Sequence, residues 1–155
     1  MSDAVNTPVS VHVEPVSRWL VEHIPGATTP FTFDLIAGGR SNLTFKVTDA
    51  AGELFVLRRP PLGHVLATAH DMAREHRIIA AVGRTEVPVP RALGVCTDDS
   101  VNGAPFYVMG WVDGVVLDSV ERAEELPPSL RRPASEHLID VLADLHAVDV
   151  DAVGL

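Results

Sequence analysis

A short polar loop and two arginines are the features of this sequence best suited to binding an anion. The loop consists of two glycines and three polar residues: Gly38, Gly39, Arg40, Ser41 and Asn42. The arginines, Arg58 and Arg59, end an apolar stretch further along the chain. Glycine has no Cβ, so the amides of such a loop can approach a ligand closely, and arginine can hold two oxygens at once. Together they predict a polyphosphate site, although a simple hairpin turn would also account for the glycines.

Other chemistries lack the spacing that they need. The seven histidines are scattered, and the sequence has no H-E-x-x-H motif and no cysteine pair to bind a metal. It has no G-x-S-x-G motif, so Ser41 is not expected to act as a hydrolase nucleophile. The glycine loop also lacks the G-K-[ST] of a P-loop and the G-x-G-x-x-G of a dinucleotide site. Cys96, the single cysteine, falls within an apolar stretch and is expected to be buried.

The composition is typical of one globular domain. The chain has 155 residues, of which 46% are hydrophobic and 21% are charged. A net charge of −9 without an extended basic patch argues against general binding to nucleic acid or to anionic membranes. A single cysteine excludes an internal disulfide and suits a reducing compartment. With no signal-peptide pattern and no apolar run of membrane-spanning length, a cytoplasmic location is expected.

The first part of the chain predicts a tail, a helix and three strands. Residues 1–12 are expected to form a flexible tail. Val16, Leu20 and Ile24 then have helical spacing, and a proline and a glycine follow them. From about residue 31 to Arg59, alternating apolar residues predict strands before and after the glycine loop, with a second turn at Asp49 to Gly52.

Two more helices and a second hairpin are expected after these strands. Leu66–Val82 reads as a helix with Glu75 on or beside its apolar face, and Leu130–Val148 reads as an amphipathic helix. The second hairpin pairs Ala92–Cys96 with Phe106–Val112. The residues expected to face inward on the last helix are Leu138, Val141, Leu142 and Leu145. The fold class is therefore α+β, with five antiparallel strands and a helix between the third and fourth.

This order of elements resembles the small lobe of a kinase. The elements follow one another as they do in protein kinases. A glycine loop comes first, followed by a cation at the end of the third strand, a helix with an acidic residue and then a hairpin. The stretches FVLRRPP, AREHRIIAAV, PVPRALGVC, FYVMGWVDG and LADLHAVD look like the phosphotransferase family that includes aminoglycoside and choline kinases. They most resemble the branch found beside acyl-CoA dehydrogenases, in which the third strand carries arginine. The resemblance covers about residue 31 to Leu155.

The resemblance implies a role for residues at the phosphate end of an ATP site. Arg58 matches the phosphate-binding cation of the third strand, and Glu75 matches its acidic partner. The loop residues matching the segment that contacts the phosphates are Gly38, Gly39, Ser41 and Asn42. As an alternative, Arg58 and Glu75 could form a surface ion pair that contributes less than about 1 kcal/mol. Arg59 is expected to face solvent or the helix.

The resemblance also implies a purine end. Met109 matches the residue behind the adenine, and the Gly110 carbonyl and Val112 amide match the groups that hydrogen-bond the base. Core packing is an alternative role for Met109. Lys46 is the only lysine in the sequence, so Arg58 has to supply the charge on the third strand. An arginine would keep phosphate binding with a different geometry.

The resemblance further implies that catalytic parts lie outside these residues. The family's catalytic aspartate, in a His-Gly-Asp loop, and its magnesium-binding aspartate come after the helix that ends this sequence. We therefore expect a kinase-like lobe at 13–114, followed at 115–155 by a linker and the first helix of a second lobe. Such a chain is expected to bind ATP but to be inactive alone, or to serve as a non-catalytic binding module. In the family the last helix packs into the second lobe, so here its apolar face must pack on the sheet, meet a second copy or stay exposed. Self-association or a complementing chain is therefore expected at this helix.

Overall fold

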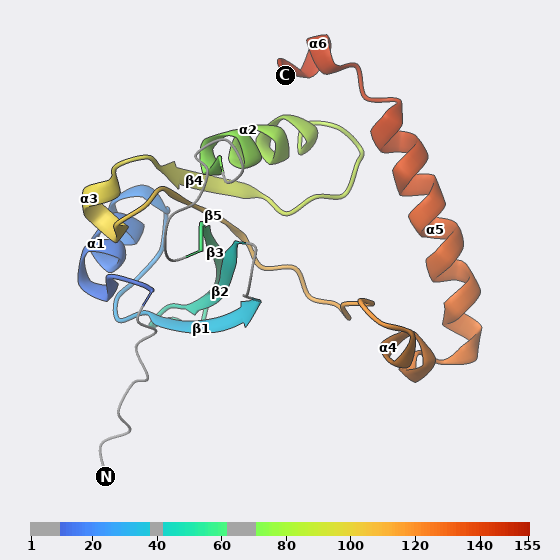
Figure 1. Cartoon of the computed structure of the whole chain (residues 1–155), viewed down its shortest axis with the longest axis horizontal. Coiled ribbons are helices and arrows are strands. Elements are labelled where there is room, and N and C mark those ends of the chain that lie inside the picture. The colour runs from blue at the N-terminus through green and yellow to red at the C-terminus, as the bar shows by residue number, and fades with distance from the viewer. Residues whose placement is uncertain (1–9, 38–41, 62–70) are drawn as a thin grey trace.

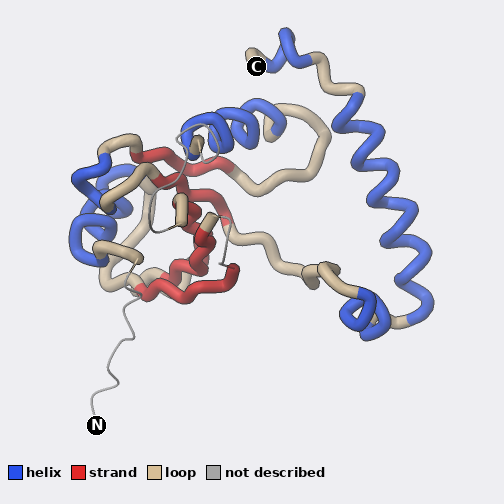
Figure 2. The backbone as a smooth tube through the Cα atoms, viewed as in Figure 1, coloured by secondary structure: helices blue, strands red, loops and turns tan. Residues whose placement is uncertain are grey.

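An antiparallel sheet of five strands is the centre of the computed structural model, which describes residues 10–37, 42–61 and 71–155 (Figure 1). The strands are β1 (Thr32–Ala37), β2 (Leu43–Thr48), β3 (Leu54–Arg59), β4 (Ala92–Cys96) and β5 (Phe106–Gly110). They lie in the order β1-β2-β3-β5-β4, and each neighbouring pair is antiparallel. Figure 2 shows the sheet as one group of strands with helices around it. The five-stranded α+β fold with a helix between β3 and β4 confirms the prediction.

Six helices complete the described part of the chain. They are α1 (Val13–His23), α2 (Met72–Val82), α3 (Asp99–Asn102), α4 (Val120–Glu125), α5 (Pro128–His146) and α6 (Val150–Val153). The first turn of α2 is capped by the Asp71 side chain, which accepts a hydrogen bond from the Arg74 amide at 2.8 Å. The expected start of this helix, residues 66–70, lies outside the described residues. The short helix α3 occupies the turn that was expected between the last two strands.

One face of the sheet packs against α1 and forms the apolar core. Strand alternation brings Phe45 and Leu57 to this face, where they are fully buried with Val16 and Leu20 of α1. Burying an aliphatic or aromatic side chain of this size stabilises a fold by roughly 1.5–3 kcal/mol. Val11 belongs to the same core, so the expectation of a flexible tail is wrong for the residues just before α1.

The opposite face of the sheet carries the polar residues. Arg58 on β3 lies between Thr44 of β2 and Tyr107 of β5 in the strand register. The next row on this face pairs Val56 with Met109. Helix α2 packs against β4 and β5, which places its first turn beside the polar row. The sheet therefore separates an apolar core from a face where charged side chains can meet.

Helix α5 lies apart from the sheet, at the end of the long segment that follows β5 (Figure 1). None of its residues is buried, and Leu138 and Leu142 are 69% and 49% exposed. The expectation that Leu138, Val141, Leu142 and Leu145 face inward is therefore wrong for this chain. The physical reason is that the apolar stripe of α5 has no packing partner among residues 10–37, 42–61 and 71–155. Within the same residues, no helix is both long enough and apolar enough to cross a bilayer.

Candidate functional site

The carboxylate of Glu75 is the centre of the polar cluster on the sheet. Its Oε2 accepts hydrogen bonds from Arg58 Nε at 3.0 Å and from the Tyr107 hydroxyl at 3.2 Å. Its Oε1 accepts a bond from Asn42 Nδ2 at 2.9 Å. These donors come from β3, β5 and the residue just before β2, so one carboxylate connects α2 to most of the sheet. We call Asn42, Thr44, Arg58, Glu75 and Tyr107 the Glu75 cluster.

Arg58 and Glu75 form the ion pair that the sequence predicts. Their side chains are 29% and 31% exposed, so the ion pair is partly buried. Arg58 Nη1 also donates to Thr44 Oγ1 at 3.0 Å, which fixes the guanidinium from a second side. A guanidinium has five N–H donors, and these two contacts use two of them. The remaining donors belong to a side chain that is partly exposed to solvent.

Asn42, which the resemblance implies in phosphate binding, contacts Glu75. Its amide nitrogen donates to Glu75, and its side chain is buried. In this structure it therefore connects the end of the glycine loop to α2. The other loop residues implied in phosphate binding, Gly38, Gly39 and Ser41, lie outside the described residues.

Tyr107 and Thr44 belong to the cluster but are not among the predicted site residues. Tyr107 is 2% exposed, and burial together with the Glu75 charge raises the pKa of its hydroxyl to about 12. It is therefore a hydrogen-bond donor at neutral pH. The His76 ring packs edge-on against it at 6.2 Å between centroids. Strand register, which aligns Thr44 and Tyr107 with Arg58, is the signal that would have identified both residues.

The implied purine end begins one row away on the same face. Met109 is two residues after Tyr107 and half-buried opposite Val56, so both side chains are on the Arg58 side of the sheet. The amide of Gly110 donates to the Arg91 carbonyl at 2.9 Å, and β5 ends at Gly110. Val112 follows the strand and is 62% exposed. Met109 and Gly110 therefore follow Tyr107 along β5, and Val112 comes just after the strand.

Arg59 corrects an expectation, because it faces neither solvent nor α2. Its side chain is 4% exposed and donates to the carbonyl oxygens of Ser10, Asn102 and Pro60, the last two at 3.1 and 3.2 Å. Burial lowers the pKa of its guanidinium. Alternation turns Arg59 away from Arg58, so it connects the segment before α1 to the end of α3. Its role is in the fold.

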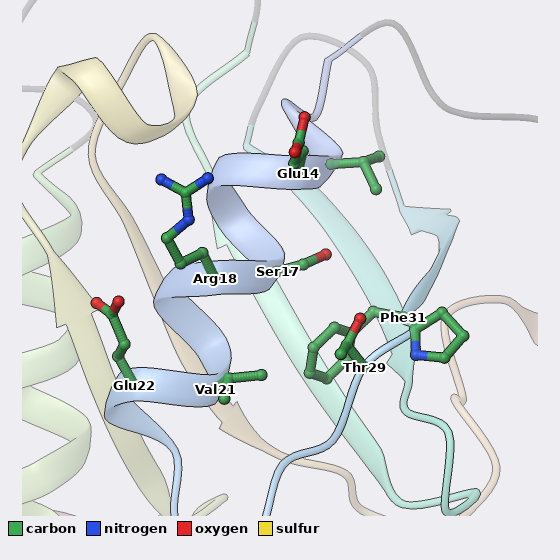
Figure 3. Close-up of a pocket in the computed structure, with 9 residues that line it drawn as sticks. Glu14, Ser17, Arg18, Val21, Glu22, Thr29 and Phe31 are labelled. Atoms are coloured by element: carbon green, nitrogen blue, oxygen red, sulfur yellow. The ribbon is translucent and has the colours of Figure 1, made fainter.

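A hollow lies on the α1 side of the sheet. It has a volume of about 530 Å³ and lies between α1 and residues 29–31. Ser17, Val21 and Phe31 border it, as Figure 3 shows. None of its lining residues belongs to the Glu75 cluster. This hollow is therefore separate from the polar face.

The described residues offer no ready metal site. Over 10–37, 42–61 and 71–155, no group of three or more His, Cys, Asp or Glu side chains is placed to hold a metal ion. Asp149, near the end of the chain, accepts hydrogen bonds from the amides of Asp151 and Ala152 at 3.1 Å each. These contacts cap α6, so the Asp149 carboxylate has a structural role.

Comparison with known proteins points to one family. The model of the phosphotransferase enzyme family matches residues 32–155. A probable acyl-CoA dehydrogenase of Arabidopsis thaliana, IBR3, is 34% identical over 146 residues, which are 89% of this chain and 18% of that protein. Acyl-CoA dehydrogenase family member 10 of Mus musculus is 38% identical over 117 residues, which are 76% of this chain and 11% of that protein. This chain therefore spans a small part of the length of these relatives.

A solved structure shows the same fold. A protein of Ralstonia eutropha JMP134, assigned as an aminoglycoside phosphotransferase, superimposes with a TM-score of 0.74 at 31% sequence identity. The match covers 94% of this chain and 41% of that one. The sheet and helices described above are thus those of a kinase-like fold, and the resemblance inferred from the sequence is confirmed.

Proposed function

Because this chain belongs to the phosphotransferase enzyme family, we propose that it forms the nucleotide-binding lobe of an ATP-dependent kinase that acts on a small molecule. The observation that carries the proposal is the Arg58 guanidinium, which Glu75 and Thr44 hold in place on the polar face of the sheet. A fixed guanidinium with unused donors is suited to charge-assisted hydrogen bonds with phosphate oxygens. Because the protein as a whole is acidic, this local cation is what would attract a triphosphate.

The proposed nucleotide lies along β5. Its phosphates contact Arg58 and the loop of Gly38, Gly39 and Ser41, and its purine contacts Met109, the Gly110 carbonyl and the Val112 amide. Tyr107, which is aligned with Arg58, and Gly110 are three residues apart on one strand, so roughly 10 Å separates the two ends of the site. Magnesium is expected in the complete family fold, and no residue of this chain is proposed as its ligand.

Titration with ATP and magnesium tests this function. We expect measurable binding by the wild-type chain, and Arg58→Ala should weaken it by about 1–3 kcal/mol because a charge-assisted phosphate contact is lost. Arg58→Lys should lie between the two, since lysine keeps the charge but not the planar geometry. Calorimetry or ligand-induced thermal stabilisation would measure both.

Arg132→Ala is the matched control for this titration. Arg132 also forms an ion pair, with Glu136 at 2.7 Å, but it lies exposed on α5 and far from the cluster along the chain. Its removal changes the net charge equally and should leave ATP affinity unchanged. Equal affinities of wild type and Arg58→Ala would contradict the phosphate contact. An absence of binding at millimolar ATP would favour a non-catalytic interaction module.

The exposed face of α5 supports a second function, which is binding to another protein surface. Leu138, Ile139 and Leu142 are all exposed on this helix, and contiguous exposed apolar surface is typical of interfaces. We propose that the rest of a phosphotransferase fold normally covers this face. When the 155-residue chain is studied alone, a second copy can take that place.

A further inference from the structure

Tyr107 has a position that a purely structural aromatic residue would not need. It alternates on β5 with Phe106 and Val108, which are fully buried in the apolar core on the other face. Tyr107 instead points to the polar face, and its hydroxyl reaches Oε2 of Glu75 at 3.2 Å. The same oxygen accepts the bond from Arg58 Nε at 3.0 Å. One carboxylate oxygen is thus shared by the cation and the phenol.

The hydroxyl limits the conformations open to Glu75. A glutamate side chain that makes only one ion pair at partial exposure can move toward water, because such pairs contribute little free energy. Here Oε1 is held by Asn42 and Oε2 by Arg58 and Tyr107, so the carboxylate is held from three directions. Tyr107 is itself fixed, since it is buried in the register position opposite Arg58 and packs against the His76 ring.

We propose that Tyr107 is a positioning residue for nucleotide recognition, whose hydroxyl holds Glu75 and, through it, the Arg58 guanidinium in the orientation that the phosphates require. This inference rests on the proposed function. Tyr107 does not need to touch the nucleotide. Its hydroxyl restricts movement of the Glu75 carboxylate and so keeps the Arg58 guanidinium in one orientation.

Binding of ATP and of adenosine by Tyr107→Phe tests the inference. This variant keeps the ring and loses only the hydroxyl, so the fold should persist. We expect ATP to bind roughly 3- to 10-fold more weakly, within the range for the net contribution of one ordinary hydrogen bond, because the hydroxyl acts on the nucleotide only through Glu75. Adenosine should bind as it does to wild type. In a Glu75→Gln background, where the carboxylate is already lost, Tyr107→Phe should have little further effect on ATP binding.

The outcomes separate this inference from the proposed function. A wild-type chain that binds no ATP would overturn both. If wild type binds ATP and Tyr107→Phe binds it equally well, only the inference is overturned. Equal weakening of adenosine and ATP would also overturn it, because a general structural role would then explain the effect.

The ionisation of Tyr107 provides an independent readout of its contact with Glu75. It is the only tyrosine of the chain, so the ultraviolet absorbance of tyrosinate reports on it alone. In the folded wild type the midpoint should lie near the pKa of about 12 that burial and the Glu75 charge produce. Glu75→Gln should lower this midpoint, and an unchanged midpoint would show that the hydroxyl does not sense the carboxylate.

Discussion

Arg58 and Arg59 are neighbours in the chain, yet the structure gives them different roles. Successive side chains of a strand point to opposite faces of the sheet. Arg58 therefore meets Glu75 on the polar face, whereas Arg59 donates to main-chain carbonyls under the segment before α1. Only the first of the two combines a carboxylate partner with access to solvent. This difference is why the proposed phosphate contact is assigned to Arg58 alone.

Asp49 holds the turn between β2 and β3 against the segment that follows α1. One carboxylate oxygen accepts bonds from the amide and hydroxyl of Thr28, both at 3.0 Å. The other accepts from the amides of Ala51 and Glu53 at 2.8 and 2.9 Å. Burial alone would raise the pKa of Asp49, but the hydrogen bonds from Glu53, Thr28 and Ala51 outweigh it and lower this pKa. The charged carboxylate therefore stabilises the folded state.

We predict that Asp49→Asn lowers the thermal midpoint at neutral pH, because the carboxamide cannot accept all four bonds. The sign of the pH dependence follows from the lowered pKa. The contribution of Asp49 is present above its unfolded pKa, about 4, and is lost as the pH falls through the lower folded pKa. The difference in midpoint between wild type and variant should be constant from about pH 5 to 7 and shrink below about pH 4. A difference that grows on acidification would contradict this account.

At the scale of elements, the strands and their order along the chain follow from the sequence because alternation and turn residues are local signals. Gly52, for example, has a φ of +84° at the predicted turn. The order β1-β2-β3-β5-β4 within the sheet was not predicted, since the pairing of β3 with β5 joins strands that are distant in the chain. The ion pair of Arg58 with Glu75 was predicted through the family resemblance, since no local pattern joins a strand to a helix. Tyr107 was missed because its role depends on which residue lies beside it in the neighbouring strand.

The prediction for α5 was wrong for a related reason. An apolar stripe shows which side of a helix can be buried, but it does not show what is available to bury it. Leu130–Val148 was correctly expected to be helical, with α5 found at Pro128–His146. Its stripe is exposed because none of the described strands or helices packs against it.

We predict that this stripe drives self-association of the 155-residue chain. Sedimentation velocity should show the sedimentation coefficient rising with concentration, and Leu138→Glu with Leu142→Glu should abolish the rise. The thermal midpoint should change little, because neither side chain is buried. A wild-type chain that stays monomeric at tens of micromolar would contradict the prediction.

A second double variant controls for the added charge. Ser129→Glu with Ala143→Glu places the same two charges at exposed positions of α5 that lie away from the stripe. This variant should associate as the wild type does. If it too stays monomeric, charge repulsion rather than loss of the apolar contact is the cause.

At the scale of the whole molecule, the chain matches 41% of the bacterial phosphotransferase structure and much less of its curated relatives. No His-Gly-Asp sequence is present in the 155 residues. Phosphoryl transfer depends on positioning and on charge at the transferred group. We therefore predict that these residues alone bind ATP but show no hydrolysis above background in a coupled assay. Clear turnover would contradict the proposal that these residues bind ATP without supplying the catalytic groups.

The position of the bound nucleotide tests the central claim most directly. At 16.6 kDa the chain is suited to NMR, and titration of the ¹⁵N-labelled protein with ATP would map the contact residue by residue. We predict that the largest shifts fall on the amides around Asn42, Arg58, Gly110 and Val112. An unchanged spectrum at millimolar ATP, or shifts confined to α1 and residues 29–31 around the hollow of Figure 3, would contradict it.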